Sequence, residues 1–307
     1  MEPKIIFEDN DILVLDKPAG MVVNKSDTTV GEKTVQEWVE GYLKIRSTKH
    51  EIRNKYKIQN SPPRADQPLA ENVQNDFEFR PDLIGIEFSN RAGIVHRLDK
   101  ETSGIILVAK TKEAFENLQK QFKERQVKKT YIALVHGEVK YPVGEINVPV
   151  GRLPWNRKRF GVLAEGREAV TKYKVLRFYE VRSGMLEAGL RSEKWDPYSD
   201  ISHRFLASQF PHHTSYSLLE LYPETGRTHQ IRVHLKYFGH PIFADPLYAG
   251  RKTARNDRKL LPRIFLHASK ISIYHPASPA GGPESKELVS FESPLPEELQ
   301  DFLLGLK

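Results

Sequence analysis

Short apolar runs separated by turn-forming residues dominate the N-terminal part of the chain. Residues 4–8 (KIIFE) and 11–15 (DILVL) each predict a short strand, with a turn at Asp9 and Asn10 between them. Residues 105–109 (IILVA) are uniformly apolar, which is typical of a buried strand. Similar patterns predict further strands at residues 130–137, 145–150, 169–178, 217–222 and 270–274.

Other segments carry helix signals. Thr34 precedes Glu37 by three residues, which is the spacing of a capping box at a helix start. Thr111 and Thr228 predict the N-caps of two more helices, and a last helix is predicted at residues 297–304. Because strands outnumber helices and often follow one another directly, the predicted fold class is α+β with a mainly antiparallel sheet.

Two segments show no clear periodicity and are predicted as insertions. Residues 45–90 are basic at first and then rich in Pro, Asn, Asp and Gln, and structureless loops of this length are uncommon inside compact domains. This segment either closes over a substrate or is a disordered excursion. Residues 181–215 contain His203, His212 and His213, but without a ligand spacing such as HExxH. We therefore predict a polar loop there and no metal site.

A charged loop lies directly before the buried strand at residues 105–109. Residues 93–104 (GIVHRLDKETSG) place five charged or titratable side chains in a short space. Charges are costly to bury, so a charged loop between apolar segments often faces a cleft. Loops on a rigid scaffold are also where catalytic groups tend to lie. Residue chemistry alone leaves a charged surface turn as an equal alternative.

Three segments together resemble a known family. Residues 96–104 (HRLDKETSG) resemble the signature of the RluA-type family of pseudouridine synthases. Residues 15–23 (LDKPAGMVV) resemble its opening motif, and residues 223–234 (PETGRTHQIRVH) resemble its late motif. Three matches in the right order are much more specific than one short motif. The chain departs from the family pattern at Asn24-Lys25 and at Ala249-Gly250, outside the residues that would carry the chemistry.

This resemblance implies a fold and an activity. The fold would be the pseudouridine synthase catalytic fold, a mixed sheet with a central cleft flanked by helices. Residues 1–307 would form one catalytic domain with the two insertions, without an accessory RNA-binding domain before Lys17-Pro18. The chain would isomerise specific uridines in structured ribosomal or transfer RNA to pseudouridine. No electrons enter or leave in that reaction, so no cofactor is expected.

The resemblance also assigns site residues. Asp99 would be the catalytic carboxylate, and Arg232 would pair with it and favour its ionised form. Tyr131 would stack on the target base and is a candidate base later in the reaction. Leu266 would form an apolar wall of the base pocket. Arg97 would fill the space left by a uridine flipped out of its stack. Whether Asp99 attacks the sugar or promotes elimination across it stays open.

Further RNA contacts are expected around these residues and on a separate basic stretch. Residues 155–160 interleave basic and aromatic side chains, which can stack on unpaired bases. The predicted RNA-binding residues, besides Arg97, are His96, Arg227, His229, Arg157, Lys158 and Arg159.

Charge and composition agree with these expectations. The 307 residues carry a formal net charge of +7, and the basic residues gather near 44–57, 152–167 and 251–263. Such clusters are expected of a polyanion binder, although an ordinary solvated surface would also account for them. The absence of cysteine excludes thiolate nucleophiles and cysteine-ligated metal sites. We expect a cytoplasmic protein, a monomer, without a membrane partner.

Two other function classes are compatible with part of the pattern. A non-catalytic RNA-binding protein or RNA chaperone on the same fold would have no need of Asp99, Tyr131 and Arg232 together. A glycosidase would need a second carboxylate facing the first, and a metal-dependent nuclease would need a carboxylate cluster. The motifs contain neither feature.

Overall fold

A twisted mixed β-sheet forms the frame of the molecule. The computed structural model describes residues 2–25, 31–43, 81–182, 213–277 and 288–306. Within these residues the sheet has nine strands, ordered β1-β2-β3-β10-β4-β9-β8-β5, with β11 also on β10. All its strand pairs are antiparallel except β3 with β10. The strands are β1 Lys4–Glu8, β2 Ile12–Lys17, β3 Ser103–Ala109, β4 Lys128–His136, β5 Val143–Asn147, β8 Val170–Arg182, β9 His213–Pro223, β10 Leu266–Tyr274 and β11 Leu288–Glu292.

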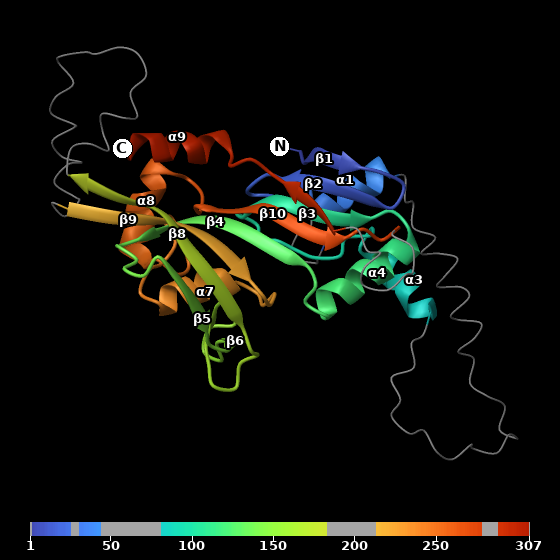
Figure 1. The fold of residues 1–307 in the computed structure, drawn as a ribbon, viewed down its shortest axis with the longest axis horizontal. Helices are drawn as coiled ribbons and strands as arrows, with labels where there is room; N and C mark the ends of the chain where they lie inside the picture. The colour runs from blue at the N-terminus through green and yellow to red at the C-terminus, as the bar shows by residue number, and fades with distance from the viewer. Residues whose placement is uncertain (1, 26–30, 44–80, 183–212, 278–287, 307) are drawn as a thin grey trace, which may run out of the picture.

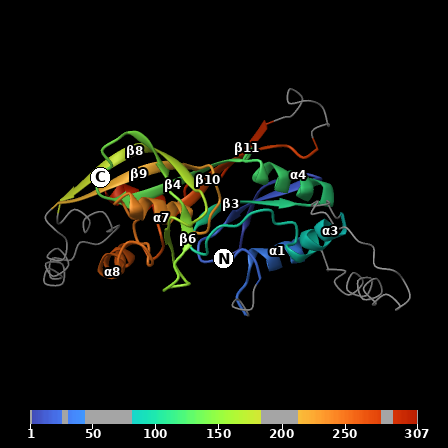
Figure 2. The same ribbon diagram turned by 90° about the horizontal axis from the view of Figure 1, so that it is seen from below.

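Helices flank both halves of this sheet, and a small hairpin projects from one half (Figures 1 and 2). The hairpin consists of β6 Val150–Arg152 and β7 Phe160–Val162. None of the helices in the described ranges is long and apolar enough to cross a membrane. The helices are α1 Val35–Tyr42, α3 Pro81–Asn90, α4 Lys112–Lys123, α7 Gln230–Tyr237, α8 Arg251–Leu260 and α9 Glu297–Gly305.

The β1–β3 half of the sheet is covered on both faces. Side chains that alternate along β2 and β3 enter two separate apolar cores, one shared with α4 and the other with α1. This double burial explains why residues 105–109 are uniformly apolar. Thr34 and Glu37 form the predicted capping box on α1, and Thr111 caps α4 through the backbone N–H of Ala114. The predicted buried strand at residues 105–109, the capping box at Thr34 and the N-cap at Thr111 are thus confirmed.

The other half of the sheet encloses the largest core. Residues of β4 and β9 pack there with α7, α9 and the segment between α7 and α8. Phe243 lies at its centre, with its ring centroid 4.8 Å from that of Phe302 and 5.4 Å from that of Tyr216. This core fixes α7 against the sheet, and α7 in turn carries one end of the late motif.

Two glycines fix the charged loop between the two halves. Gly93 and Gly104 both have positive φ, at 73° and 113°. A Cβ on Gly93 would lie 2.0 Å from the carbonyl oxygen of Ala109, and one on Gly104 would lie 2.2 Å from that of Ala268. Only glycine fits at either position. The loop therefore begins and ends in tight contact with strands β3 and β10.

The predicted fold class is confirmed, but several boundaries are wrong. The last ten residues of the first predicted insertion form helix α3, and both ends of the second belong to strands β8 and β9. Residues 145–150 are divided between β5 and β6. Helix α8 was not predicted because only Ala254 and Asp257 of its ten residues are buried, which leaves no apolar stripe.

Candidate active site

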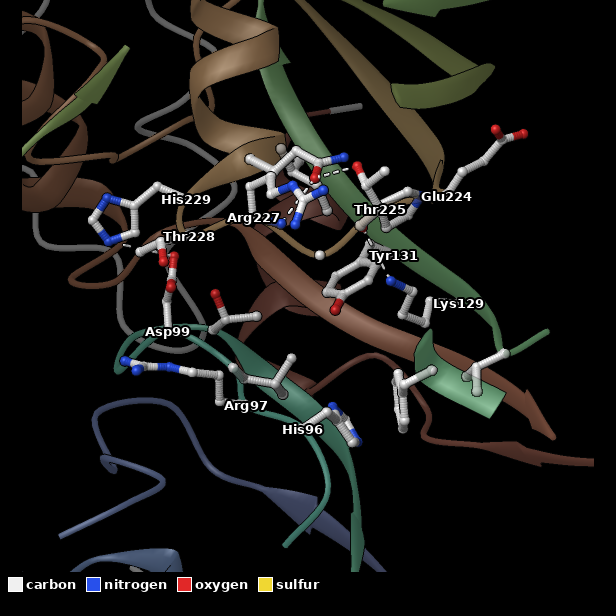
Figure 3. A pocket seen from close by; sticks show the side chains of 18 of the residues that line it. His96, Arg97, Asp99, Lys129, Tyr131, Glu224, Thr225, Arg227, Thr228 and His229 are labelled. Atoms are coloured by element: carbon white, nitrogen blue, oxygen red, sulfur yellow. Dashed lines mark hydrogen bonds and ion pairs between the residues drawn. The ribbon is translucent and has the colours of Figure 1, made fainter. Parts of the chain in front are cut away.

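A cavity of about 570 Å³ opens between the charged loop and the late motif (Figure 3). One wall is formed by residues 95–99 and another by residues 223–232, while Tyr131 of β4 and Leu266 of β10 lie between them. Segments that are more than 100 residues apart in the sequence thus meet around one space. Its volume is in the range of pockets that hold small molecules or single nucleotides.

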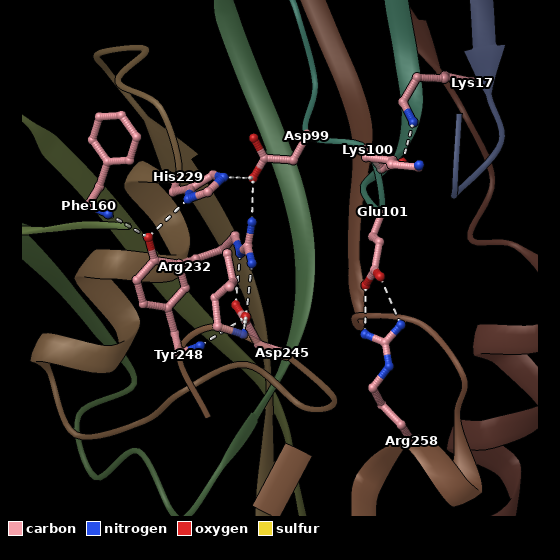
Figure 4. Close-up of polar contacts among 11 residues, drawn as sticks. Lys17, Asp99, Lys100, Glu101, Phe160, His229, Arg232, Asp245, Tyr248 and Arg258 are labelled. Carbon is pink, nitrogen blue, oxygen red and sulfur yellow. Dashed lines mark hydrogen bonds and ion pairs between the residues drawn. The ribbon is translucent and has the colours of Figure 1, made fainter. Parts of the chain in front are cut away.

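Asp99 presents its carboxylate to this cavity. Its side chain is 21% exposed, so it is accessible to a bound molecule. Nη1 of Arg232 donates a hydrogen bond of 3.0 Å to its Oδ2. Nε2 of His229 lies 3.8 Å from the same oxygen. The carboxylate is therefore held from one side by α7 and left open on the other (Figure 4).

Arg232 is shared between two carboxylates. Its Nε and Nη2 donate to the two oxygens of Asp245 at 2.8 and 2.9 Å, which leaves Nη1 for Asp99. Its guanidinium also lies over the ring of Tyr248, 5.1 Å from the centroid. Burial opposes the charged form, but the hydrogen bonds to Asp245 and Asp99 outweigh it and raise the Arg232 pKa above its ordinary value. The guanidinium is therefore permanently charged.

The turn before α7 is held by buried hydrogen bonds. Oε1 of Gln230 accepts from the hydroxyl of Thr225 and from the backbone N–H of Arg227, and its amide nitrogen donates to the carbonyl of Val170. His229 occupies the N-cap position with a left-handed backbone (φ 57°) and makes no side-chain cap. The prediction that Thr228 caps this helix is therefore wrong. The Gln230 side chain instead ties the turn before α7 to the start of β8, next to the residue that α7 carries toward Asp99.

Tyr131 and Leu266 form the inner wall of the cavity. Leu266 is buried and Tyr131 is partly buried. Burial raises the pKa of the Tyr131 hydroxyl well above its ordinary value, and the negative charge of Asp99 adds to the effect. A phenol that stays protonated can stack on a base and donate a hydrogen bond. It can accept a proton only after it has lost its own.

Three cationic side chains surround the opening. Arg97 is exposed beside Asp99, and Nε of Arg227 donates to the carbonyl of Glu168 at 3.1 Å. Lys129, which the sequence analysis missed, lines the cavity and donates to the carbonyl of Thr225 at 3.1 Å. Burial lowers the pKa of Lys129 to about 8. Lys129 lies two residues before Tyr131 on β4. Its place in the cavity wall is therefore evident only from the folded structure.

His96 has a structural contact that argues against its predicted role in RNA binding. Its Nε2 accepts a hydrogen bond of 2.9 Å from the backbone N–H of Leu107, and its ring packs on Phe122. Burial, helped by the charges of Lys129 and Arg91, lowers the His96 pKa to about 3. A neutral imidazole with one nitrogen already occupied is a poor phosphate ligand. The contact instead attaches the charged loop to β3.

The basic hairpin lies beside the cavity and does not line it. Arg157 and Lys158 are exposed, Arg159 is partly exposed, and none of the three reaches the cavity wall. The hairpin touches the site through Phe160, whose backbone N–H donates to the hydroxyl of Tyr248 at 3.1 Å. That hydroxyl lies 2.9 Å from Nδ1 of His229, and Nε2 of the same ring lies 3.8 Å from Oδ2 of Asp99. The hairpin is thus placed to contact a substrate outside the pocket.

Lys17 and Arg258 attach the charged loop to the rest of the fold. Nζ of Lys17, which is fully buried, donates to the carbonyls of Pro18, Met21 and Lys100 at 2.9 to 3.0 Å. Burial, with the charge of Arg263, lowers its pKa to about 7. Glu101 pairs through both oxygens with Arg258 of α8. The two residues that directly follow Asp99, Lys100 and Glu101, are thus tied to the rest of the fold (Figure 4).

The histidines considered as metal ligands do not form a site in the described residues. His203 and His212 lie outside the described ranges, and His213 begins β9. Within those ranges no group of three or more His, Asp or Glu side chains is placed to hold a metal ion.

Comparison with known proteins assigns the family. The sequence profile of the RNA pseudouridylate synthase family matches residues 11–237, which include the cavity walls except Leu266. The chain belongs to this family. It is therefore an isomerase that acts on RNA, and its resemblance to the RluA-type members is confirmed.

Two curated relatives match nearly the whole chain. One, an uncharacterized RNA pseudouridine synthase from Synechocystis sp., is 31% identical over 99% of this chain and 68% of its own length. The other, ribosomal large subunit pseudouridine synthase D from Nitrosomonas europaea, is 32% identical over 99% of this chain and 65% of its own length. The chain thus spans about two thirds of each of these relatives.

Solved structures show the same fold. Human RNA pseudouridylate synthase domain containing 1 superposes with a TM-score of 0.56 at 22% sequence identity, over 97% of this chain and 86% of that protein. Human RNA pseudouridylate synthase domain containing 4 gives 0.55 at 20% identity, over 98% and 92%. The predicted pseudouridine synthase fold is confirmed.

Proposed function

We propose that this chain converts specific uridines of large-subunit ribosomal RNA to pseudouridine, with Asp99 as the catalytic carboxylate. The observation that carries the proposal is the position of Asp99 at the cavity wall, held by one nitrogen of Arg232 at 3.0 Å. The ribosomal substrate is supported by the name of the relative from Nitrosomonas europaea. Transfer RNA is the alternative substrate.

The pair formed by Asp99 and Arg232 meets the main chemical requirement of the reaction, which is an ionised carboxylate beside the nucleotide. The bond from N1 of uracil to C1′ of the ribose breaks, and a bond from C5 to C1′ forms. The hydrogen on C5 leaves as a proton and N1 gains one, so the product is an isomer of the substrate. An ionised Asp99 can attack C1′ or accept a proton in an elimination across the sugar. Both routes need the charge that Arg232 stabilises.

We further propose that Tyr131 and Leu266 form the surface against which the uracil ring packs. Both line the inner wall, and aromatic and apolar side chains are the usual contacts of a base taken out of its stack. The protonated hydroxyl of Tyr131 can donate a hydrogen bond to the ring. In this role Tyr131 keeps the base in place while the glycosidic bond is broken and remade.

The geometry also disfavours the non-catalytic RNA-binding protein that the residue pattern alone left open. Burying Arg232 between Asp99 and Asp245 desolvates three charges, which is costly even when they are paired. A protein that only binds RNA would gain nothing from this arrangement, since phosphates are held as well by exposed cations.

The proposal is tested by incubating the purified chain with transcripts of large-subunit ribosomal RNA and, separately, with transfer RNA. Pseudouridine is detected by carbodiimide modification and primer extension. We expect new signals at defined uridines of the ribosomal transcript. Signals in transfer RNA alone would correct the substrate, and none in either RNA under conditions where RNA binding is measured would favour the binding protein.

RNA binding should depend strongly on salt. Cations released from phosphates drive such binding, so the logarithm of the affinity should fall linearly with the logarithm of salt concentration. Replacing Arg157, Lys158 and Arg159 by Ala should reduce the magnitude of that slope by about 2 to 3, since each phosphate contact contributes about 0.7 to 0.9. A control variant replaces three exposed lysines that do not line the cavity: Lys4, Lys33 and Lys140. Equal slopes for both variants would refute the role of the hairpin.

Arg97 should matter most when the target uridine is stacked. It is exposed at the cavity opening, and no ion pair or hydrogen bond of its side chain is recorded within the described ranges. If it replaces the flipped base, Arg97→Ala should lower turnover of a structured substrate by about ten-fold more than turnover of an unpaired one, because flipping an unpaired base costs less. Single-turnover rates on the two RNAs provide the measurement. Equal losses on both would count against this role.

A further inference from the structure

Asp245 is buried behind Arg232, out of reach of a substrate. Its side chain has no exposed surface and does not line the cavity. Its Oδ2 accepts from Nε of Arg232 at 2.8 Å. Its Oδ1 accepts from Nη2 of Arg232 at 2.9 Å and from the backbone N–H groups of Leu247 and Tyr248 at 2.8 and 3.1 Å. Both oxygens are therefore committed, and half of the hydrogen bonds go to one side chain.

The backbone at this point is held in an unfavourable conformation. Ala244, directly before Asp245, has a left-handed φ of 60°. Such a conformation costs about 1 to 2 kcal/mol in a residue with a Cβ. It is held in place by Asp257 of α8, whose Oδ2 accepts from the backbone N–H of Ala244 at 3.0 Å. A strained backbone supported in this way commonly marks a position with a functional constraint.

We propose that Asp245 is a positioning residue of the isomerisation: it orients the guanidinium of Arg232 so that only Nη1 meets Asp99. This role rests on the proposed function of Asp99. An arginine fork binds a carboxylate most strongly through two parallel hydrogen bonds. Asp245 occupies Nε and Nη2, so Asp99 receives one hydrogen bond and keeps the rest of its lone pairs for the substrate (Figure 4).

The sharing of the Arg232 charge between Asp245 and Asp99 also leaves Asp99 available to react. Asp99, Arg232 and Asp245 together carry one net negative charge when both carboxylates are ionised, whereas Asp99 and Arg232 alone would be neutral. An Arg232 released from Asp245 could turn both of its terminal nitrogens to Asp99 and neutralise it. A carboxylate capped in this way is a weaker nucleophile and a weaker base. Asp245 thus allows Arg232 to hold Asp99 without blocking it.

Asp257 offers a matched control. It is also a buried aspartate, it supports the same segment through Ala244, and its Oδ2 contacts Nε2 of His136 at 2.9 Å, but no contact with Arg232 is recorded for it. Asparagine at position 257 keeps a side-chain oxygen that can accept from the backbone N–H of Ala244, so the support of this segment is retained. Asp257→Asn therefore removes a buried negative charge near the site without touching the guanidinium of Arg232.

The test is the steady-state kinetics of Asp245→Asn on an RNA that the wild type modifies. We expect kcat to fall by about 10 to 100-fold, by analogy with the loss of a residue that orients a metal ligand, with KM for RNA within about two-fold of the wild type. Asp257→Asn should keep kcat within about three-fold. Far-ultraviolet circular dichroism and thermal melting verify that each variant is folded at the assay temperature.

A double-mutant cycle separates positioning from stability. Once Arg232 is replaced by Lys, which lacks the planar fork, Asp245→Asn should lower kcat by no more than about two-fold further. Asp257→Asn should have the same effect in the Arg232→Lys background as alone. Additive losses for Asp245→Asn would overturn the proposal, and so would equal losses in the two Asn variants.

A second variant covers the case in which Asp245→Asn does not fold. Asp245→Glu keeps the buried charge and moves it by one methylene, so we expect a folded protein with reduced kcat and an unchanged KM. Wild-type kcat in either folded variant would overturn the proposal. A wild-type chain that makes no pseudouridine would instead count against the proposed function, so the two failures are distinguishable.

Discussion

Asp99→Asn is expected to abolish pseudouridine formation while leaving the fold and RNA binding intact. Asparagine matches the shape of aspartate but has no charge, so it can neither attack C1′ nor accept a proton. Nη1 of Arg232 can still donate to the amide oxygen at about the same place. We expect a rate at least about 10⁴-fold below that of the wild type, similar to the loss of other catalytic nucleophiles and bases. Single-turnover assays with excess enzyme provide the measurement.

The control for this variant is a carboxylate outside the site. Asp11 lies at the β1–β2 turn and does not line the cavity, and among the described residues it forms hydrogen bonds only through its backbone. Asp11→Asn should retain activity within about two-fold, as expected for a surface substitution. Loss of RNA binding in Asp99→Asn would indicate a role in binding instead of catalysis. Retained turnover would contradict the catalytic assignment itself.

Arg232→Ala is expected to damage stability as well as activity. It removes the partner of Asp99 and also leaves the fully buried carboxylate of Asp245 without a counter-ion. Removing one partner of a buried ion pair typically costs about 3 to 5 kcal/mol. We therefore expect the free energy of unfolding, measured by urea denaturation, to fall by about that amount, and the turnover rate to fall by more than about 10³-fold.

Two further variants separate these effects. Arg97→Ala removes an exposed arginine at the same cavity and should change the free energy of unfolding by less than about 0.5 kcal/mol. Arg232→Lys keeps the charge but cannot form the fork, so it should recover part of the stability and little of the activity. An Arg232→Ala protein as stable as the wild type would show that the Asp245 pair contributes nothing, contrary to its burial.

Much of the site follows from the sequence because most of its residues come from two short motifs. Asp99, Arg97 and His96 lie in one motif, and Arg227, His229 and Arg232 lie in another, so a match to both predicts that they meet. Tyr131 and Leu266 complete the same cavity. The strands β2 and β3 were predictable because residues 12–15 and 105–109 are apolar without interruption, and that pattern reflects their burial on both faces of the sheet.

The partners of these residues could not be predicted in the same way. Asp245 and Lys129 are charged, and charged residues are ordinarily expected at the surface. Their burial depends on contacts made only after folding, such as the bonds between Asp245 and Arg232 and between Lys129 and the carbonyl of Thr225. Helix α8 was missed for a related reason, since its buried Asp257 resembles the exposed polar residues around it. Periodicity detects apolar burial and does not detect buried charge.

The most direct test of the central claim is a map of pseudouridine in ribosomal RNA from cells that lack this gene, complemented with the wild-type chain or with Asp99→Asn. Carbodiimide modification followed by primer extension reads every uridine of the large-subunit RNA in each strain. We expect at least one pseudouridine to disappear with the gene, to return with the wild type and to stay absent with Asp99→Asn expressed at the same level. Restoration of that pseudouridine by Asp99→Asn would contradict the account.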